Sequence, residues 1–518
     1  MKIRSIPFTK ILLVLVCFAL SSTAQAVLPA PDGGYPGGNT AEGQNALFSL
    51  TTGGFNTANG FLSLRSNTEG SFNTATGAGA LLLNTADENT ATGAGALLSN
   101  TTGLRNTASG AFALFSNTEG SFNTATGDQA LFSNTTGNVN TAIGAGALTN
   151  NTTGDHNTAI GGDFVLFNNT SGSFNTAVGV DALASNTTAG ANTANGAFAL
   201  LSNTTGGGNT AIGISALQGN TTASENTAIG AAALNTNTTG DANTATGSHA
   251  LHSNTTGIDN TANGALALFS NTTGQGNTAI GSAALYNNNT ATGITGNTAI
   301  GASALFTNST GGANTATGSG ALINNSTGFR NIALGVGAGF NVTTASDVIC
   351  IGTDGANVST SCYIGQIFGK TSSGGTAVFI NSDGKLGTTT SSRRFKEEIK
   401  PMERASEVVF ALKPVTFRYK KGIDPQGIPQ FGLVAEDVEA VNPDLVVRDK
   451  EGKVNTVRYD TINAMLLNEF LKAHAKLQQQ QATIEKQQKQ IQALTTGLQK
   501  VSDQLELKMP SLRTADNH

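Results

Sequence analysis

A five-residue motif, Asn-Thr-Ala-x-Gly, recurs at nearly constant spacing and limits how this chain can fold more than any other feature. Of the 17 intervals between successive motifs, 14 are 17 residues long. A fixed period over so many copies predicts a repeat architecture in which each unit packs on the next. The motif begins at Asn39, Asn56, Asn73, Asn89, Asn106, Asn123, Asn140, Asn157, Asn175, Asn192, Asn209, Asn226, Asn243, Asn260, Asn277, Asn297 and Asn314, and a variant begins at Asn331.

Each unit has the composition of a thin coil. Most units place Ala-Leu seven and eight positions after the Asn, as in Ala80-Leu81, and follow it with Asn-Thr-Thr-Gly or a close variant. Ala and Leu can fill a narrow interior, Gly permits a positive φ at a corner, and Asn and Thr can bond the backbone of turns. We interpret the unit as two short strands joined by two turns. Stacked about 4.8 Å apart, the coils predict a mainly β fibre, a β-roll or β-solenoid, roughly 85 Å long.

Several units carry the closely related sequence Asn-x-Ala-Ile-Gly, at Asn140, Asn157, Asn209, Asn226 and Asn277. This pattern resembles the left-handed β-roll heads of trimeric autotransporter adhesins, although the period here is longer than is usual for those heads. The resemblance implies a trimeric fibre. We assign residues 39–337 to the repeats.

The N-terminal residues predict export. A charged start, an apolar run from Ile11 to Leu20 and the small-residue site Ala24-Gln25-Ala26 are typical of a signal peptide, which we place at residues 1–26. A Pro/Gly-rich linker follows at residues 27–38. No later stretch has the roughly 18 apolar residues of a membrane helix, so we expect no integral membrane anchor. The expected location is the periplasm, the cell surface or the medium.

Charge is sparse and uneven, which argues against nucleic-acid binding. Charged residues make up 12% of the chain, its formal net charge is -5, and no lysine occurs between Lys10 and Lys370. A protein that binds nucleic acid needs a basic surface, which this sequence lacks. We therefore expect no nucleic-acid partner.

Beyond the repeats the sequence divides into four segments. We assign residues 338–390 to a neck, 391–464 to a small α+β domain, 465–508 to a coiled coil and 509–518 to a tail. Heptads predict a coiled coil but do not by themselves fix the number of helices. One seam position is occupied by Phe470, Leu477, Ile484, Ile491, Leu498 and Leu505, and the other by Ala473, Gln480, Gln487, Leu494 and Val501.

A serine and a lysine lie five residues apart where the neck meets the small domain. Ser391 and Lys396 can form a Ser/Lys dyad if the chain turns back there, with a neutral amine taking the hydroxyl proton as the serine attacks a carbonyl. Free lysine is almost fully protonated at neutral pH, so a lysine base needs burial or neighbouring cations. Arg393 and Arg394 are such cations.

Five sequence blocks around this pair resemble the intramolecular chaperone auto-processing domain of endosialidase-type phage tailspikes. The resemblance implies that the domain trimerises the chain, helps the fibre to fold and then cuts itself off. By position it implies Ser391 as nucleophile, Lys396 as base and Thr390-Ser391 as the cleaved bond. Ser392 departs from the aspartate that this family often has there. The blocks are Ser-Ser-Arg-Arg-Phe-Lys-Glu-Glu-Ile at 391–399, Leu-Lys-Pro-Val with Phe-Arg-Tyr at 412–419, Phe-Gly-Leu-Val-Ala-Glu-Asp-Val at 431–438, Pro-Asp-Leu-Val at 443–446 and Val-Arg-Tyr at 457–459.

Other candidate sites are weaker. Cys350 and Cys362 would remain after export, and a local disulfide and two free thiols are both open interpretations. His249 and His252 lack Cys or carboxylate partners at the spacing of a metal site. Gly-Ala-Gly-Ala runs recur with the repeat and lack the Gly-Lys-Ser/Thr of a phosphate loop. We expect no cofactor and no metal.

The sequence therefore predicts an exported homotrimeric β-fibre, adhesin-like or tail-fibre-like, with a self-cleaving C-terminal chaperone. The alternative is a structural surface fibre whose C-terminal domain stays attached as a permanent trimerisation clamp. A glycan-cleaving fibre is a poorer third hypothesis, because the repeats hold no recurrent carboxylate pair. A surface glycan or a host-cell receptor is the expected partner of the fibre.

Overall fold

A computed structural model describes residues 35–289, 296–370, 372–381, 383–449 and 451–508. The chain divides into two units at the boundary between Lys370 and Thr371. The predicted signal peptide, residues 27–34 of the predicted linker and the tail at 509–518 lie outside the described residues.

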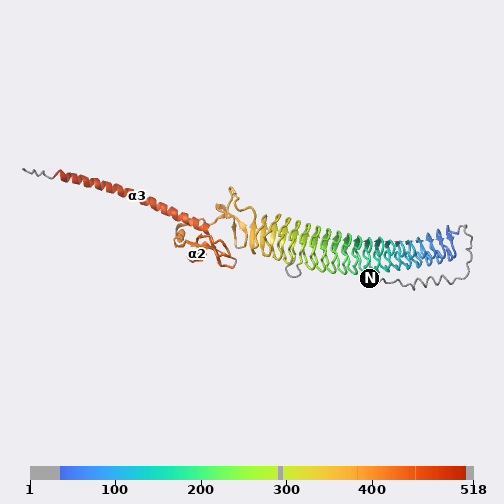
Figure 1. Ribbon diagram of the computed structural model, residues 1–518. Helices are drawn as coiled ribbons and strands as arrows, with labels where there is room; N and C mark the ends of the chain where they lie inside the picture. Colours follow the sequence, from blue (N-terminus) through green and yellow to red (C-terminus); the bar gives the residue numbers. More distant parts are fainter. Residues whose placement is uncertain (1–34, 290–295, 371, 382, 450, 509–518) are drawn as a thin grey trace, which may run out of the picture. The chain divides into compact units, whose positions relative to one another are not determined.

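The first unit is a parallel β-solenoid, confirmed as the fold predicted from the repeats (Figure 1). Every motif contributes one strand that pairs in parallel with the strand of the next coil. From β1 to β17 threonine lies opposite threonine and alanine opposite alanine, as for Ala142 and Ala159. The strands are β1 (Thr40–Glu42), β2 (Thr57–Asn59), β3 (Thr74–Thr76), β4 (Thr90–Thr92), β5 (Thr107–Ser109), β6 (Thr124–Thr126), β7 (Thr141–Ile143), β8 (Thr158–Ile160), β9 (Thr176–Val178), β10 (Thr193–Asn195), β11 (Thr210–Ile212), β12 (Thr227–Ile229), β13 (Thr244–Thr246), β14 (Thr261–Asn263), β15 (Thr278–Ile280), β16 (Thr298–Ile300), β17 (Thr315–Thr317), β18 (Ile332–Leu334), β19 (Val348–Ile351) and β20 (Ser361–Ile364).

The prediction of two strands in each unit is wrong, because each coil has one three-residue strand and the Ala-Leu side is built from turns. In one coil Gln129 and Leu131 both have a positive φ, of 56° and 53°, so this side is not extended. It still bonds to the next coil, since the Leu131 amide donates to the Ala147 carbonyl at 2.9 Å. The interior leucine therefore lies on a segment whose residues alternate between positive and negative φ, and this segment takes the place of a second strand.

The core is a narrow column of alanine and leucine, as predicted. In the coil that contains β6, Ala125, Ala130 and Leu131 are all fully buried, and the same three positions are buried along the solenoid. The coils extend past residue 337, because β19 and β20 continue the parallel sheet within the segment predicted as a neck.

The motif glycine occupies a corner where neighbouring coils come close. Gly127 has a φ of 133°, and a Cβ placed on it would lie 2.5 Å from the carbonyl oxygen of Gly144. A side chain would therefore be both strained and in collision with the next coil. This explains why glycine ends the motif.

Two columns of buried asparagine run through the solenoid. The first asparagine ladder consists of the residues that open each motif, and the second of the asparagines about eleven positions later. The side-chain oxygen of Asn140 accepts hydrogen bonds from the backbone amide and side-chain amide of Asn157, at 2.9 and 3.2 Å. Its side-chain amide donates to the Gly154 carbonyl at 2.8 Å and to Asn123 at 3.1 Å. Each asparagine thus joins three coils while its own polar atoms are satisfied.

The second unit contains small elements followed by one long helix (Figure 1). The buried residues Val438, Leu445, Val446, Val457 and Ile462 form a small core. Its elements are β21 (Phe379–Ile380), β22 (Leu386–Gly387), the 3-10 helices η1 (Arg393–Phe395), η2 (Glu403–Ala411) and η3 (Pro443–Leu445), the strands β23 (Val415–Phe417), β24 (Gln430–Gly432), β25 (Val446–Arg448) and β26 (Val454–Val457), and the helices α2 (Ala435–Val441) and α3 (Tyr459–Glu506). The pairs β21–β22, β23–β24 and β25–β26 are antiparallel.

Helix α3 is 48 residues long and carries the predicted heptad seam. In a single chain the large apolar residues of this seam are exposed, at 46% for Ile484 and 62% for Ile491. Leu477, Leu498 and Leu505 are exposed in the same way. A surface stripe of this length leaves apolar area in water that a neighbouring helix could cover.

Candidate active site

The chain turns back at η1 and brings Ser391 and Lys396 together. The turn is closed by two backbone hydrogen bonds, from Phe395 to the Ser392 carbonyl at 3.0 Å and from Lys396 to the Arg393 carbonyl at 3.1 Å. A single 3-10 turn reverses the chain within a few residues, so side chains five positions apart can meet. The turn that the dyad requires is therefore present.

The two candidate catalytic side chains are in hydrogen-bond contact. Nζ of Lys396 donates to Oγ of Ser391 at 3.1 Å, a distance suited to proton transfer between a nucleophile and its base. Both residues are exposed to solvent in a single chain. The guanidinium of Arg394 lies 4.5 Å from the centre of the Phe395 ring, so the ring holds this cation beside the turn.

The pair lies in an open groove of about 1070 Å³ that also includes Thr390. One wall comes from residues 378–381 around β21, and another from residues 447–449, 451 and 455–461 of the β25–β26 hairpin and the start of α3. The groove thus holds both residues of the predicted cleaved bond together with the candidate nucleophile and base. Residues 457–459 in this wall form the fifth block of the resemblance, but neither they nor the rest of the hairpin were identified from sequence as part of the site.

The motif blocks of the small domain meet one another and form the scaffold of this groove. The Leu433 amide donates to the hydroxyl of Tyr459 at 3.1 Å, which links the third block to the fifth. Gly432 allows this contact, since a Cβ there would lie 2.8 Å from the Tyr459 hydroxyl. The Arg458 amide donates to the Leu445 carbonyl at 2.8 Å, which links the fifth block to the fourth. The blocks that carry the resemblance are therefore mostly packing and positioning residues.

A second serine lies beside a lysine and a carboxylate, but its geometry is structural. Ser406 in η2 is fully buried, and its hydroxyl bonds to the carboxylate of Glu469 and accepts from Asn468 at 2.7 Å. Hydrogen bonds from Lys472, at 2.6 Å, and from Ser406 hold the pKa of Glu469 below its usual range. This cluster fastens η2 to α3, and a buried hydroxyl with its bonds already made is not placed to attack a peptide.

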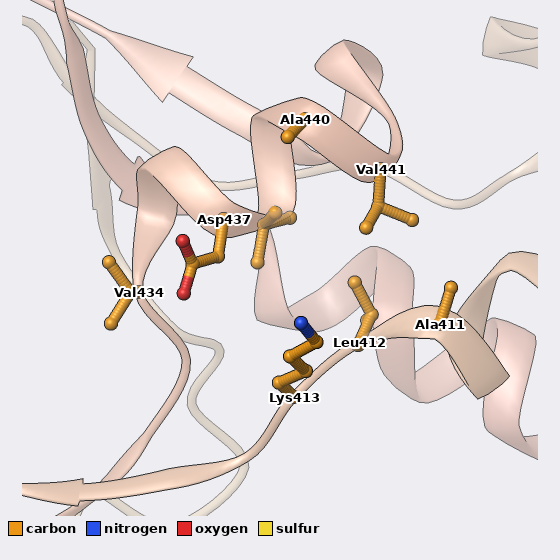
Figure 2. A pocket seen from close by; sticks show the side chains of 8 residues that line it. Ala411, Leu412, Lys413, Val434, Asp437, Ala440 and Val441 are labelled. Atoms are coloured by element: carbon orange, nitrogen blue, oxygen red, sulfur yellow. The ribbon is translucent and has the colours of Figure 1, made fainter.

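A small pocket lies between the end of η2 and α2. Figure 2 shows Lys413 and Asp437 on opposite sides of it, and its volume is about 170 Å³. Sites for small molecules are usually about 300–1000 Å³, so this pocket is too small for a substrate site. The remaining lining residues include Leu412, Val434 and Val441.

Cys350 and Cys362 are free thiols on two neighbouring strands and form no disulfide. Cys350 in β19 faces the core, whereas Cys362 in β20 is exposed. In the strand register Cys362 lies opposite Ile349, and residues one position apart on paired strands point to opposite faces. Burial, and then the neighbouring Cys362, raises the pKa of the Cys350 thiol, which makes it a poor nucleophile.

The histidine pair belongs to a column of stacked rings. His252, Phe269, Tyr286 and Phe306 stack from coil to coil with ring centroids 5.1–5.2 Å apart, and His249 lies 5.4 Å from His252. Burial lowers the pKa of His252. Across the described ranges, no three His, Cys, Asp or Glu side chains form a group that could hold a metal ion.

Among the helices in the described part of the chain, none is both long enough and apolar enough to cross a bilayer.

Comparison with known families identifies the segment that contains the dyad. Residues 391–447 match the family model described as chaperone of endosialidase, so the resemblance predicted from the motif blocks is confirmed for this segment. The match begins at Ser391 and runs through the turn, η2, the β23–β24 pair, α2 and η3. A segment of this family that follows a long β-solenoid fits a tail-fibre-like protein. No curated protein and no solved structure matches the chain.

Proposed function

We propose that this chain is an exported homotrimeric β-fibre whose C-terminal domain trimerises it and then cuts itself off between Thr390 and Ser391. The observation that carries the proposal is the 3.1 Å contact between Lys396 and Ser391, at the first residues of the family match. In this proposal the enzyme acts only on its own chain, and the product fibre ends at Thr390.

The proposed chemistry needs only groups that the groove contains, together with water. The neutral amine of Lys396 takes the hydroxyl proton as Oγ of Ser391 attacks the carbonyl carbon of Thr390. The C–N bond breaks, the α-amino group of Ser391 takes up a proton, and the Thr390 acyl group becomes an ester on Oγ. Water then hydrolyses this ester, which leaves a carboxylate on Thr390 and restores the serine hydroxyl.

The exposed seam of α3 supports trimer formation, which the chaperone of endosialidase family also implies. Burying a leucine, isoleucine or phenylalanine side chain gains roughly 1.5–3 kcal/mol, so a seam of six such levels is a strong driving force. Neighbouring chains would also enclose the exposed dyad. A groove with less water strengthens the electrostatic interactions on which proton transfer depends.

The repeats explain why a fibre of this kind would need a chaperone. Neighbouring coils differ little in sequence, so contacts between three fibres do not strongly favour one axial alignment over a slipped one. A C-terminal trimer would align the three chains at one end. Once many coils are stacked, a high unfolding barrier can hold the fibre without the clamp.

Exposed rings on the solenoid support a role in binding a surface glycan or a host-cell receptor. Phe55, Phe72, Phe122 and Phe174 directly precede the motif asparagine of their coils and are between 51% and 64% exposed. Contiguous exposed apolar surface on a soluble protein often marks a site of interaction, and the rings of Phe55 and Phe72 stack on each other with centroids 5.1 Å apart. We propose these residues as the contact surface for that partner.

Intact mass measurement of the expressed full chain tests the cleavage. We expect a released fragment of 128 residues, 391–518, from the wild type. Ser391→Ala and Lys396→Ala should each leave the chain uncut but still trimeric by light scattering, whereas the control Ser392→Ala should be cut. An uncut wild-type trimer would instead support the permanent clamp, and loss of cleavage in Ser392→Ala alone would move the nucleophile by one residue.

A further inference from the structure

The outer face of the solenoid sheet displays an uninterrupted ladder of threonines. Each strand from β1 to β17 begins with a threonine, and the register places each one opposite the next, as for Thr107 and Thr124. The alanine between the two outward residues of each strand is buried, so the first and third residues face away from the core. Threonine hydroxyls and methyl groups therefore repeat about every 4.8 Å along this face.

The hydroxyls of this ladder make no hydrogen bond within the protein, whereas threonines elsewhere in the coil do. Thr101, Thr118 and Thr135 lie on another side of the solenoid, and Thr101 and Thr118 each donate to the carbonyl of the next in the series, at 2.9 and 3.1 Å. Among the described residues, no strand threonine of β1–β17 has such a partner. The repeated threonine on the sheet thus has no polar role inside the fold and is free to bond outward.

Four consecutive strands carry a hydroxyl in both outward columns. These strands, β3 to β6, read Thr-Ala-Thr, Thr-Ala-Thr, Thr-Ala-Ser and Thr-Ala-Thr. Outward residues of one strand are about 6.6 Å apart, so this patch is a regular grid with two fixed spacings. In the described strands β1–β18, the only charged outward residue is Glu42. The third residue of β7, β8 and β9, which also faces outward, is isoleucine or valine. The outward side chains of these strands are therefore all β-branched.

We propose that this face, centred on β3–β6, binds ice. A rigid, uncharged grid of hydroxyl and methyl groups can hold water molecules in fixed positions, and hexagonal ice presents oxygen atoms with repeat distances of the same order. A parallel solenoid sheet keeps the grid in register because each coil is bonded to the next by its backbone and by the first asparagine ladder. A dry interface is a poorer use of the face, because it would bury many hydroxyls that lack a partner in the chain.

The test uses the full chain and two measurements, thermal hysteresis and partition of the protein into slowly growing ice. We expect the wild type to show both. The partition of the double variant Thr92→Lys/Thr107→Lys into ice should be at least tenfold lower than that of the wild type, because two long cations disrupt the grid. The matched control is Thr102→Lys, an exposed threonine in the same coil as Thr92 but outside the strand, which should behave as wild type.

A second variant guards against effects of charge on folding. Thr92→Val/Thr107→Val keeps the β-branched shape and removes only the hydroxyls, so we expect a smaller loss with an unchanged circular dichroism spectrum. The proposal is overturned if the wild type shows neither activity or if the lysine variant keeps both. It is also overturned if the lysine variant changes the oligomeric mass by light scattering, since the face would then be an interface between copies of this chain.

Discussion

Replacing one buried asparagine should weaken the solenoid far more than replacing an exposed residue of the same coil. In Asn140→Ala, the backbone amide of Asn157 loses the acceptor that it contacts at 2.9 Å. The other groups that Asn140 contacts keep a partner, since Asn157 still donates to the Gly172 carbonyl and the Gly154 carbonyl still accepts from Asn151. The variant therefore leaves one buried donor without a partner.

The expected cost follows from these bonds. An orphaned buried amide costs about 1–3 kcal/mol, and the loss of the remaining bonds brings the total to roughly 2–4 kcal/mol. Because about 1.4 kcal/mol is a factor of ten, the opening of the coils around residue 140 should become about 30- to 700-fold more favourable. The effect should be local, since each coil contacts only its neighbours.

Native-state hydrogen exchange, followed by mass spectrometry on peptides, can measure this opening. The control is Thr153→Ala, an exposed residue of the same coil, which should change stability by less than about 0.5 kcal/mol. Asn140→Asp should be at least as harmful as Asn140→Ala, because a carboxylate cannot donate to the Gly154 carbonyl. Equal exchange rates in Asn140→Ala and Thr153→Ala would refute the view that the first asparagine ladder stabilises the stack.

Three further predictions concern assembly and the C-terminal unit. Residues 27–390 expressed alone should be insoluble or monomeric, and a soluble trimer with the melting behaviour of the cleaved wild type would show that the C-terminal domain is not a required chaperone. Ile484→Asp should lower the oligomeric mass in sedimentation, because it places carboxylates in the seam; an unchanged trimer would contradict the coiled-coil assignment. Glu469 has a lowered pKa from its bonds to Lys472 and Ser406, so its stabilisation is present above the unfolded pKa and is lost as pH falls through the folded pKa. The protection factors of amides in η2, which compare each exchange rate with its intrinsic rate at the same pH, should therefore fall in acid. Glu469→Gln should remove most of that pH dependence.

The pairing of the candidate nucleophile and base could be predicted from the sequence, because the two residues are close together in the chain. Ser391 and Lys396 are five residues apart, and one short turn is enough to join them. The groove around them could not be predicted, because residues 447–449, 451 and 455–461 reach it only through the packing of the β25–β26 hairpin and the start of α3. The spacing of residues along the sequence does not show which hairpin, distant in the chain, forms a wall of the site.

The disulfide question shows the same limit. Cys350 and Cys362 are close together in the sequence of a chain that we predict to be exported. Whether they can form a disulfide depends on the register of β19 and β20, in which the two cysteines are offset by one residue. A shift of one position moves a side chain to the opposite face of a sheet. Only the pairing of β19 with β20 decides that Cys350 points inward and Cys362 outward.

The sequence by itself determined the stack of coils, because a 17-residue period with Ala and Leu at fixed positions has apolar groups that only a neighbouring coil can cover. It also determined which residues fill the core. The tertiary structure alone decided how each coil is shaped: one strand, an Ala-Leu side with alternating φ, and two asparagine ladders that bond from coil to coil. The reason is that the side chain of an asparagine can form hydrogen bonds either within its own turn or with the next coil, and the sequence does not distinguish the two. Contacts between residues 17 positions apart decide which of these hydrogen bonds form.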